Sequence, residues 1–284
     1  GLGVGMAMVL PAILIGWRER RRQSPCHHAN PSWKAWSWLF FWAIFTHPLL
    51  DCCTTYGTQV LQPFDDYRAA FNNISVVDPI YTLPFLICVL VTTRLVRNSP
   101  RRRFVNLLGI GLSSAYLLLT FFHKDRVNDV FESSLREQGI AYERYMTAPT
   151  ILNNVLWQGI AETDSSYHYG LYSLFDDDPR VDTFEVIPKN HHLMHPYRDE
   201  RAYRILRWFS NGYYSIVPLP DGRLQFNDLR FGTIRRSDTD DENYVFKFIL
   251  EKREDGRLEA FQEEASRRDL DGAFEYLWER AKGD

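Results

Sequence analysis

Long runs of hydrophobic residues fill the first part of the chain and are rare in the rest. Four such runs precede residue 124: Leu2–Trp17, Trp36–Cys53, Val76–Val96 and Phe104–Phe122. A helix needs roughly 20 mostly apolar residues to cross a bilayer, and short loops separate these runs. The pattern therefore predicts a multi-span α-helical membrane domain over residues 1–123, whose first helix begins inside an apolar run.

Residues 124–284 show the shorter patterns of a water-exposed domain. An amphipathic helix is predicted over residues 125–146, and Ala148-Pro149 ends it. Further helices are predicted over Arg198–Phe209 and Arg257–Lys282. Apolar and polar residues alternate, with turn residues between them, in five predicted strands: Val155–Glu162, Tyr167–Phe175, Tyr213–Leu219, Arg223–Phe231 and Tyr244–Glu251. This part is expected to be an α+β domain with one antiparallel sheet of about five strands.

Charge divides the chain at the same place. Residues 1–123 carry 11 Lys+Arg and 5 Asp+Glu, whereas residues 124–284 carry 22 and 31. The basic residues gather at 18–34 and 94–103, which the positive-inside rule assigns to the cytoplasm. The alternation of spans then predicts an extracytoplasmic C-terminal domain. A net charge of −3 and the absence of a basic tail argue against nucleic acid as the main partner.

The string Thr46-His47-Pro48-Leu49-Leu50-Asp51 carries the strongest chemical signal in the apolar part. His47 and Asp51 are four residues apart and share one face of a helix. An acidic residue in the middle of a span costs about 2.5–3.5 kcal/mol, so it is normally paired, hydrated or bound to an ion. Imidazole and carboxylate are both zinc ligands. Spacing alone leaves two interpretations open, a metal site and a simple His–Asp hydrogen bond.

Other polar residues give weaker signals. Asp78 precedes the third apolar run, where it is either a further ligand or the N-cap of the helix, and its position favours the cap. His191, His192 and His195 lie near Asp199, a grouping more typical of a solvated loop than of a metal site. The four cysteines have no zinc-binding spacing.

The strings THPLLDCCTTYGTQ, PFDD and VVDPIYTLP together resemble the YdjM-like family of membrane-bound, metal-dependent hydrolases. The resemblance is most specific over Thr46–Pro84. It extends over 1–123 by hydrophobic pattern and, less specifically, into the tail. The family's His-x-x-x-Asp element is similar to those of zinc-dependent phospholipase C and P1-type nucleases.

The resemblance implies a divalent metal ion, zinc before others, bound by His47, Asp51 and Asp78. Asp51 and Asp78 are then the candidate catalytic residues, which orient the attacking water or accept its proton. The implied reaction is hydrolysis of a phospholipid or another amphiphilic phosphoester at the outer face of the bacterial inner membrane. The bilayer itself is the implied partner.

One departure from the family pattern keeps an alternative open. A Pro-Asp-x-Asp element and a His-Arg-Gly-x-(Ser/Thr)-His element are expected upstream of the region that matches, and neither occurs here. Without them the set holds one histidine and two aspartates. The alternative is a non-catalytic membrane protein whose extracytoplasmic domain binds a partner or an envelope component. A transporter is disfavoured because no inverted repeat is visible.

Overall fold

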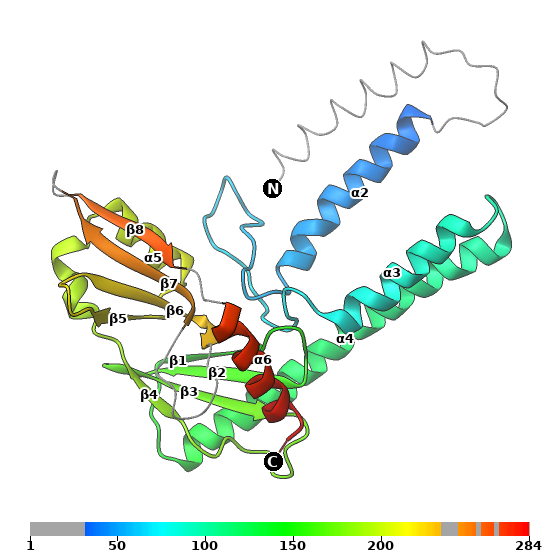
Figure 1. Cartoon of the computed structure of the whole chain (residues 1–284). Coiled ribbons are helices and arrows are strands. Elements are labelled where there is room, and N and C mark those ends of the chain that lie inside the picture. Colours follow the sequence, from blue (N-terminus) through cyan, green and yellow to red (C-terminus); the bar gives the residue numbers. More distant parts are fainter. Residues whose placement is uncertain (1–31, 234–243, 254–256, 264–266, 284) are drawn as a thin grey trace. The chain divides into compact units, whose positions relative to one another are not determined.

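The computed structural model describes residues 32–233, 244–253, 257–263 and 267–283 (Figure 1). The chain forms two compact units, Gly1–Asn72 and Asn73–Asp284. The described part of the first unit consists of helix α2 (Trp33–Asp51) and a loop closed by a bridge between Thr58 and Ala69. The first predicted span, Leu2–Trp17, lies outside the described residues.

Helices α3 (Pro79–Arg94) and α4 (Pro100–Glu137) form a hairpin in the second unit (Figure 1). Each begins with the same device, a capping side chain followed by proline. Asp78 caps α3, and the hydroxyl of Ser99 accepts a hydrogen bond from the backbone N–H of Arg102. Proline suits the first helical position because the missing N–H is unsatisfied there anyway. The two helices pack closely at Gly109, where a Cβ would lie 2.7 Å from the Cβ of Cys88.

The prediction of a multi-span helical membrane domain is wrong. Within the described residues, only α4 is both long and apolar enough to cross a bilayer. Helix α3 has 16 residues and reaches about 24 Å, against about 30 Å of hydrocarbon. Asp78-Pro79 starts this helix late and the extended backbone of Leu95 ends it early, which an apolar run alone does not reveal. The predicted division at residue 123 falls inside α4.

The first sheet carries the end of α4 on one face. Its four antiparallel strands follow the chain order: β1 (Arg144–Pro149), β2 (Leu156–Glu162), β3 (Ser166–Ser173) and β4 (Glu185–Pro188). Val127 and Phe131 of α4 pack against Trp157 and Tyr172 in a fully buried cluster. The Phe131 ring occupies the place where a side chain at Gly159 would project, so glycine is required on β2.

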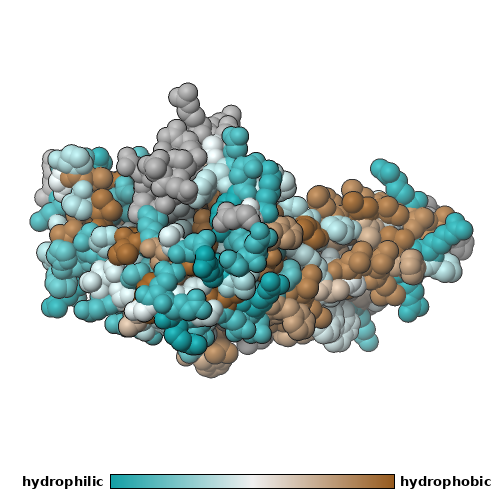
Figure 2. Space-filling model, turned by 90° about the horizontal axis from the view of Figure 1, so that it is seen from below, coloured by the Kyte–Doolittle hydropathy of each residue, from teal (hydrophilic) through white to brown (hydrophobic). Residues whose placement is uncertain are grey.

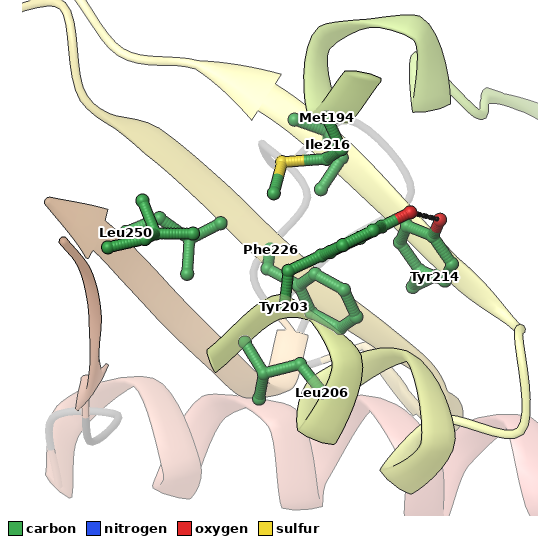
Figure 3. Close-up of a cluster of buried hydrophobic side chains, with 8 residues drawn as sticks. Met194, Tyr203, Leu206, Tyr214, Ile216, Phe226 and Leu250 are labelled. Carbon is green, nitrogen blue, oxygen red and sulfur yellow. Dashed lines mark hydrogen bonds between the residues drawn. The ribbon is translucent and has the colours of Figure 1, made fainter. Parts of the chain in front are cut away.

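The second sheet is also antiparallel and four-stranded, with the order β5 (Tyr214–Pro218), β6 (Leu224–Thr233), β7 (Tyr244–Lys252) and β8 (Leu258–Glu263). The 3₁₀ helix η1 (His191–Tyr197) and helix α5 (Arg201–Phe209) supply side chains to its core. Figure 3 shows Met194 of η1 and Tyr203 and Leu206 of α5 converging on the strands. The hydroxyls of Tyr203 and Tyr214 lie 2.6 Å apart.

A single sheet of about five strands was the expectation, and two sheets of four are found. All five predicted strands are confirmed as β2, β3, β5, β6 and β7. The three missed strands, β1, β4 and β8, are edge strands, whose outer sides face water and blur the alternating pattern. β1 begins inside the predicted 125–146 helix. β8 falls inside the predicted Arg257–Lys282 helix, of which only α6 (Arg267–Ala281) is helical.

Candidate functional site

The histidine and the aspartate of the Thr46–Asp51 string lie side by side on the last turn and a half of α2. His47 Nε2 is 3.4 Å from Asp51 Oδ2. Both side chains remain open, with 77% and 45% of their surface exposed. Asp51 is the final helical residue, and its backbone carbonyl accepts a hydrogen bond from the Thr54 hydroxyl. The pair therefore presents an imidazole nitrogen and a carboxylate to an incoming group from one direction.

Asp78 has a different environment. It is 2% exposed and caps α3: Oδ1 accepts hydrogen bonds from the backbone N–H groups of Ile80 (2.9 Å) and Tyr81 (3.2 Å). Oδ2 accepts a third bond from the Tyr116 hydroxyl of α4, at 2.8 Å. Both carboxylate oxygens thus hold the start of α3 to α4. His47 and Asp51 belong to the first unit and Asp78 to the second.

No three His, Cys, Asp or Glu side chains gather in a way that would hold a metal ion within the described ranges. The described residues thus bring His47 and Asp51 together without a third side chain of these types. The role of all three predicted residues as metal ligands or catalysts stays a prediction.

Two histidines of the second unit, His191 and His123, make packing and hydrogen-bond contacts, whereas His192 and His195 are exposed. His191 stacks on Tyr214 with 3.9 Å between ring centroids, and its Nε2 lies 2.8 Å from the Tyr214 carbonyl oxygen. Burial disfavours the charged imidazolium and lowers the pKa of His191. His123 contacts the side chain of Asn154, with 2.8 Å between Nδ1 and Oδ1. These contacts tie loops and helices to the sheets.

A polar row on α4, which the sequence analysis did not identify, joins the helix to the rest of its unit. Its members recur at every fourth position: Tyr116, Thr120, Lys124 and Asn128. The Lys124 ammonium donates to the Thr147 hydroxyl (2.6 Å), and this hydroxyl donates to the Asn128 side chain (2.6 Å). A four-residue repeat of polar side chains along one helix face was the available signal.

The same row is tied to the loop before α3. The fully buried Asn73 donates to the Thr120 hydroxyl at 2.7 Å, and its backbone carbonyl accepts from the Asn154 side chain at 2.7 Å. Asn154 precedes β2, so one chain of hydrogen bonds joins the loop, α4 and the first sheet. Such bonds are costly to lose when they are buried. These bonds therefore fix the position of α4 along its axis relative to the first sheet.

Comparison with known proteins gives one family. Residues 2–127 match the family model described as YdjM inner membrane protein. This range includes the His47–Asp51 pair, Asp78, α3 and most of the polar row. No curated protein and no solved structure matches the chain. The match to a family of inner membrane proteins and the apolar helix α4 both indicate association with a lipid bilayer.

Proposed function

Because residues 2–127 belong to the YdjM family of inner membrane proteins, we propose that the protein is a membrane-bound hydrolase that uses a divalent metal ion. The observation that carries the proposal is the exposed His47–Asp51 pair, with its ring nitrogen and carboxylate oxygen 3.4 Å apart. Both groups are open to solvent, as the ligands of an incoming ion must be.

His47 and Asp51 are of the ligand types that zinc binds, but they supply only part of the number of ligands that zinc needs. Zinc binds histidine nitrogen and carboxylate oxygen, and a catalytic site has three protein ligands plus a water or substrate. His47 and Asp51 supply two of them on one helix face. The proposed ligand set leaves out Asp78, because all its hydrogen bonds serve the cap and Tyr116. A third protein ligand is therefore a requirement of the proposal.

The bound ion would lower the pKa of a water molecule to about 7 and so supply the nucleophile. His47 would hold the ion through its imidazole and Asp51 through its carboxylate, whose nearest atoms are Nε2 and Oδ2. The Asp51 carboxylate would also orient the water or accept its proton.

The surroundings favour an amphiphilic substrate. Several large apolar side chains of α2 are exposed near the pair, among them Phe45 (51%) and Leu49 (50%). An exposed apolar patch of this kind suits a lipid or a partner rather than water. A phosphoester with a lipid tail, such as a phospholipid, would place its polar bond at the pair and its tail along α2.

Metal content is the direct test. The full chain, purified in detergent, should hold zinc or a similar ion, and the content should fall in both His47→Ala and Asp51→Ala. Asp66→Ala is the matched control, since it removes an exposed carboxylate from the same unit. Mass spectrometry of the metals then decides. Equal metal in all four proteins, or none in a folded wild type supplied with ions, would end the proposal.

We also propose that the two sheets lie outside the cytoplasm. Arg101, Arg102 and Arg103 occupy the first turn of α4, and the positive-inside rule assigns such residues to the cytoplasmic face. The opposite end of α4 then emerges on the far side of the membrane. A C-terminal alkaline phosphatase fusion should be active and a C-terminal green fluorescent protein fusion dark. The reverse pattern would invert the orientation.

A further inference from the structure

The connection between α3 and α4 concentrates positive charge. Within ten residues it holds five arginines and no acidic residue: Arg94, Arg97, Arg101, Arg102 and Arg103. Four of the five side chains are exposed, and Arg102 is half-buried. Figure 2 shows the same arrangement from outside, with hydrophobic residues covering the hairpin and hydrophilic ones at its far end.

Three of these arginines stand at an electrostatically unfavourable place. The N-terminus of a helix carries about half a positive charge, which favours anions and disfavours cations. The first turn of α4 nevertheless has three arginines and no acidic residue. An anion bound there would offset both the arginine charges and the helix dipole.

An apolar groove lies directly beside this charge. It measures about 430 Å³ and runs between the end of α3 and the start of α4. Its lining is Val91, Leu95, Pro100, Arg101, Phe104 and Val105. Arg101 is the only charged residue of the lining, so the groove has an apolar floor and a guanidinium at its edge.

We propose that this end of the α3–α4 hairpin binds an anionic phospholipid. Arg101 and its neighbours hold the phosphate, and the groove holds the start of an acyl chain. Guanidinium groups bind phosphate through paired hydrogen bonds, which an ammonium does not match. A free phosphate would have no use for the groove, and a zwitterionic lipid would bring its own cation next to the arginines. Only an anionic lipid uses both features.

The surroundings place the site at the surface of a bilayer. Exposed Phe104 (66%) and Leu107 (57%) follow the arginines on α4 and have the apolar character of a lipid-facing surface. Basic clusters next to a membrane segment are attracted to anionic lipids, by about tenfold or less per residue. The lipid therefore joins a hairpin whose shorter helix, α3, does not reach across the hydrocarbon by itself.

The test uses the full chain in a non-ionic detergent and short-chain lipids as probes. Dihexanoyl phosphatidylglycerol should bind about tenfold more tightly than dihexanoyl phosphatidylcholine, measured by thermophoresis at one ionic strength. The double variant Arg101→Gln/Arg103→Gln should lose that preference. Arg136→Gln should keep it, because this arginine is exposed at the opposite end of the same helix.

The groove has its own readout. Phe104→Ala should lower the binding affinity for both lipids by a similar factor, since it removes apolar lining and leaves the charge unchanged. Equal binding of the two lipids, or an unchanged preference in the double variant, would overturn the proposal. Inorganic phosphate that binds as tightly as phosphatidylglycerol would replace the lipid with a simple anion. If Phe104→Ala binds both lipids as tightly as the wild type, the groove does not hold the acyl chain.

Discussion

The two halves of α4 bury opposite kinds of side chain. Over residues 100–123, called here the first half, the buried residues are Gly109, Ser113 and Thr120, while Leu118 (63%) and Phe122 (71%) are exposed. Over residues 124–137, the second half, large apolar residues dominate the buried set: Val127, Val130, Phe131 and Leu135, with the small Ser134 beside them. Small residues let helices approach closely inside a membrane, where lipid solvates the large apolar ones. One continuous helix thus follows two sets of packing rules.

The strongest test of this difference compares the same substitution in both halves. Phe131→Ala removes a ring that is 1% exposed and packs over Gly159, so the unit should lose about 3–5 kcal/mol of stability. Phe122→Ala is the matched control at 71% exposure and should change stability in detergent by less than about 0.5 kcal/mol. Denaturant unfolding followed by circular dichroism measures both. Equal losses would mean that the two halves do not differ in packing.

The cap of α3 gives the next largest effect. Asp78→Ala removes three hydrogen bonds and should cost about 1–3 kcal/mol, measured as a lower unfolding midpoint. Asp78→Asn should restore most of it, because asparagine is an equally good N-cap. The same pair distinguishes the cap from a metal ligand. A folded Asp78→Asn protein that loses its metal would return Asp78 to the ligand set.

The close contact within the hairpin has a matched pair of glycines. Gly109→Ala would place a Cβ 2.7 Å from that of Cys88 and should cost about 1–2 kcal/mol. Gly111→Ala meets no atom within 4 Å and should instead stabilise the helix by about 0.5–1 kcal/mol. Thermal unfolding in detergent gives the order of the two variants. A stabilised Gly109→Ala would show that α3 and α4 pack more loosely.

The smallest effect is a pH dependence confined to the water-exposed domain. Burial opposes the charge of Glu162, but hydrogen bonds from Lys189 and Arg144 outweigh it, so the pKa of this carboxyl lies below its usual 4.5. The ionised Glu162, held by Lys189 and Arg144, therefore stabilises the fold above about pH 4.5. That contribution is lost as the pH falls through the lowered pKa. Glu162→Gln should flatten stability in this acidic range. An unchanged profile would assign acid unfolding to other groups.

The predictable part of the fold is the part with a strong local pattern. The long apolar run of α4 and the alternating central strands β2, β3, β6 and β7 follow from periodicity. Three of the four edge strands, β1, β4 and β8, did not, because their outer side faces water and blurs the alternation, whereas the edge strand β5 was predicted. The Asp78-Pro79 pair in the sequence indicates where α3 begins. The length of the helix also depends on its end at Arg94, which the sequence pattern did not reveal.

The candidate site divides in a similar way. The spacing of His47 and Asp51 correctly predicts that they share a helix face, since a helix fixes neighbours four residues apart. The engagement of Asp78 by Tyr116 was not predictable, because the two residues are 38 apart in sequence and meet only through the hairpin. Tertiary contacts of this kind decide whether a carboxylate is available for chemistry.

Helix α4 runs unbroken from Pro100 to Glu137, about 57 Å, with no proline or glycine after Gly111 to bend it. Lys124 and Asn128 of the polar row tie the second half of α4 to β1. Because the helix is continuous, a change in the tilt of its apolar half would turn the first sheet by the same angle, which would couple the thickness of the bilayer to the orientation of that sheet.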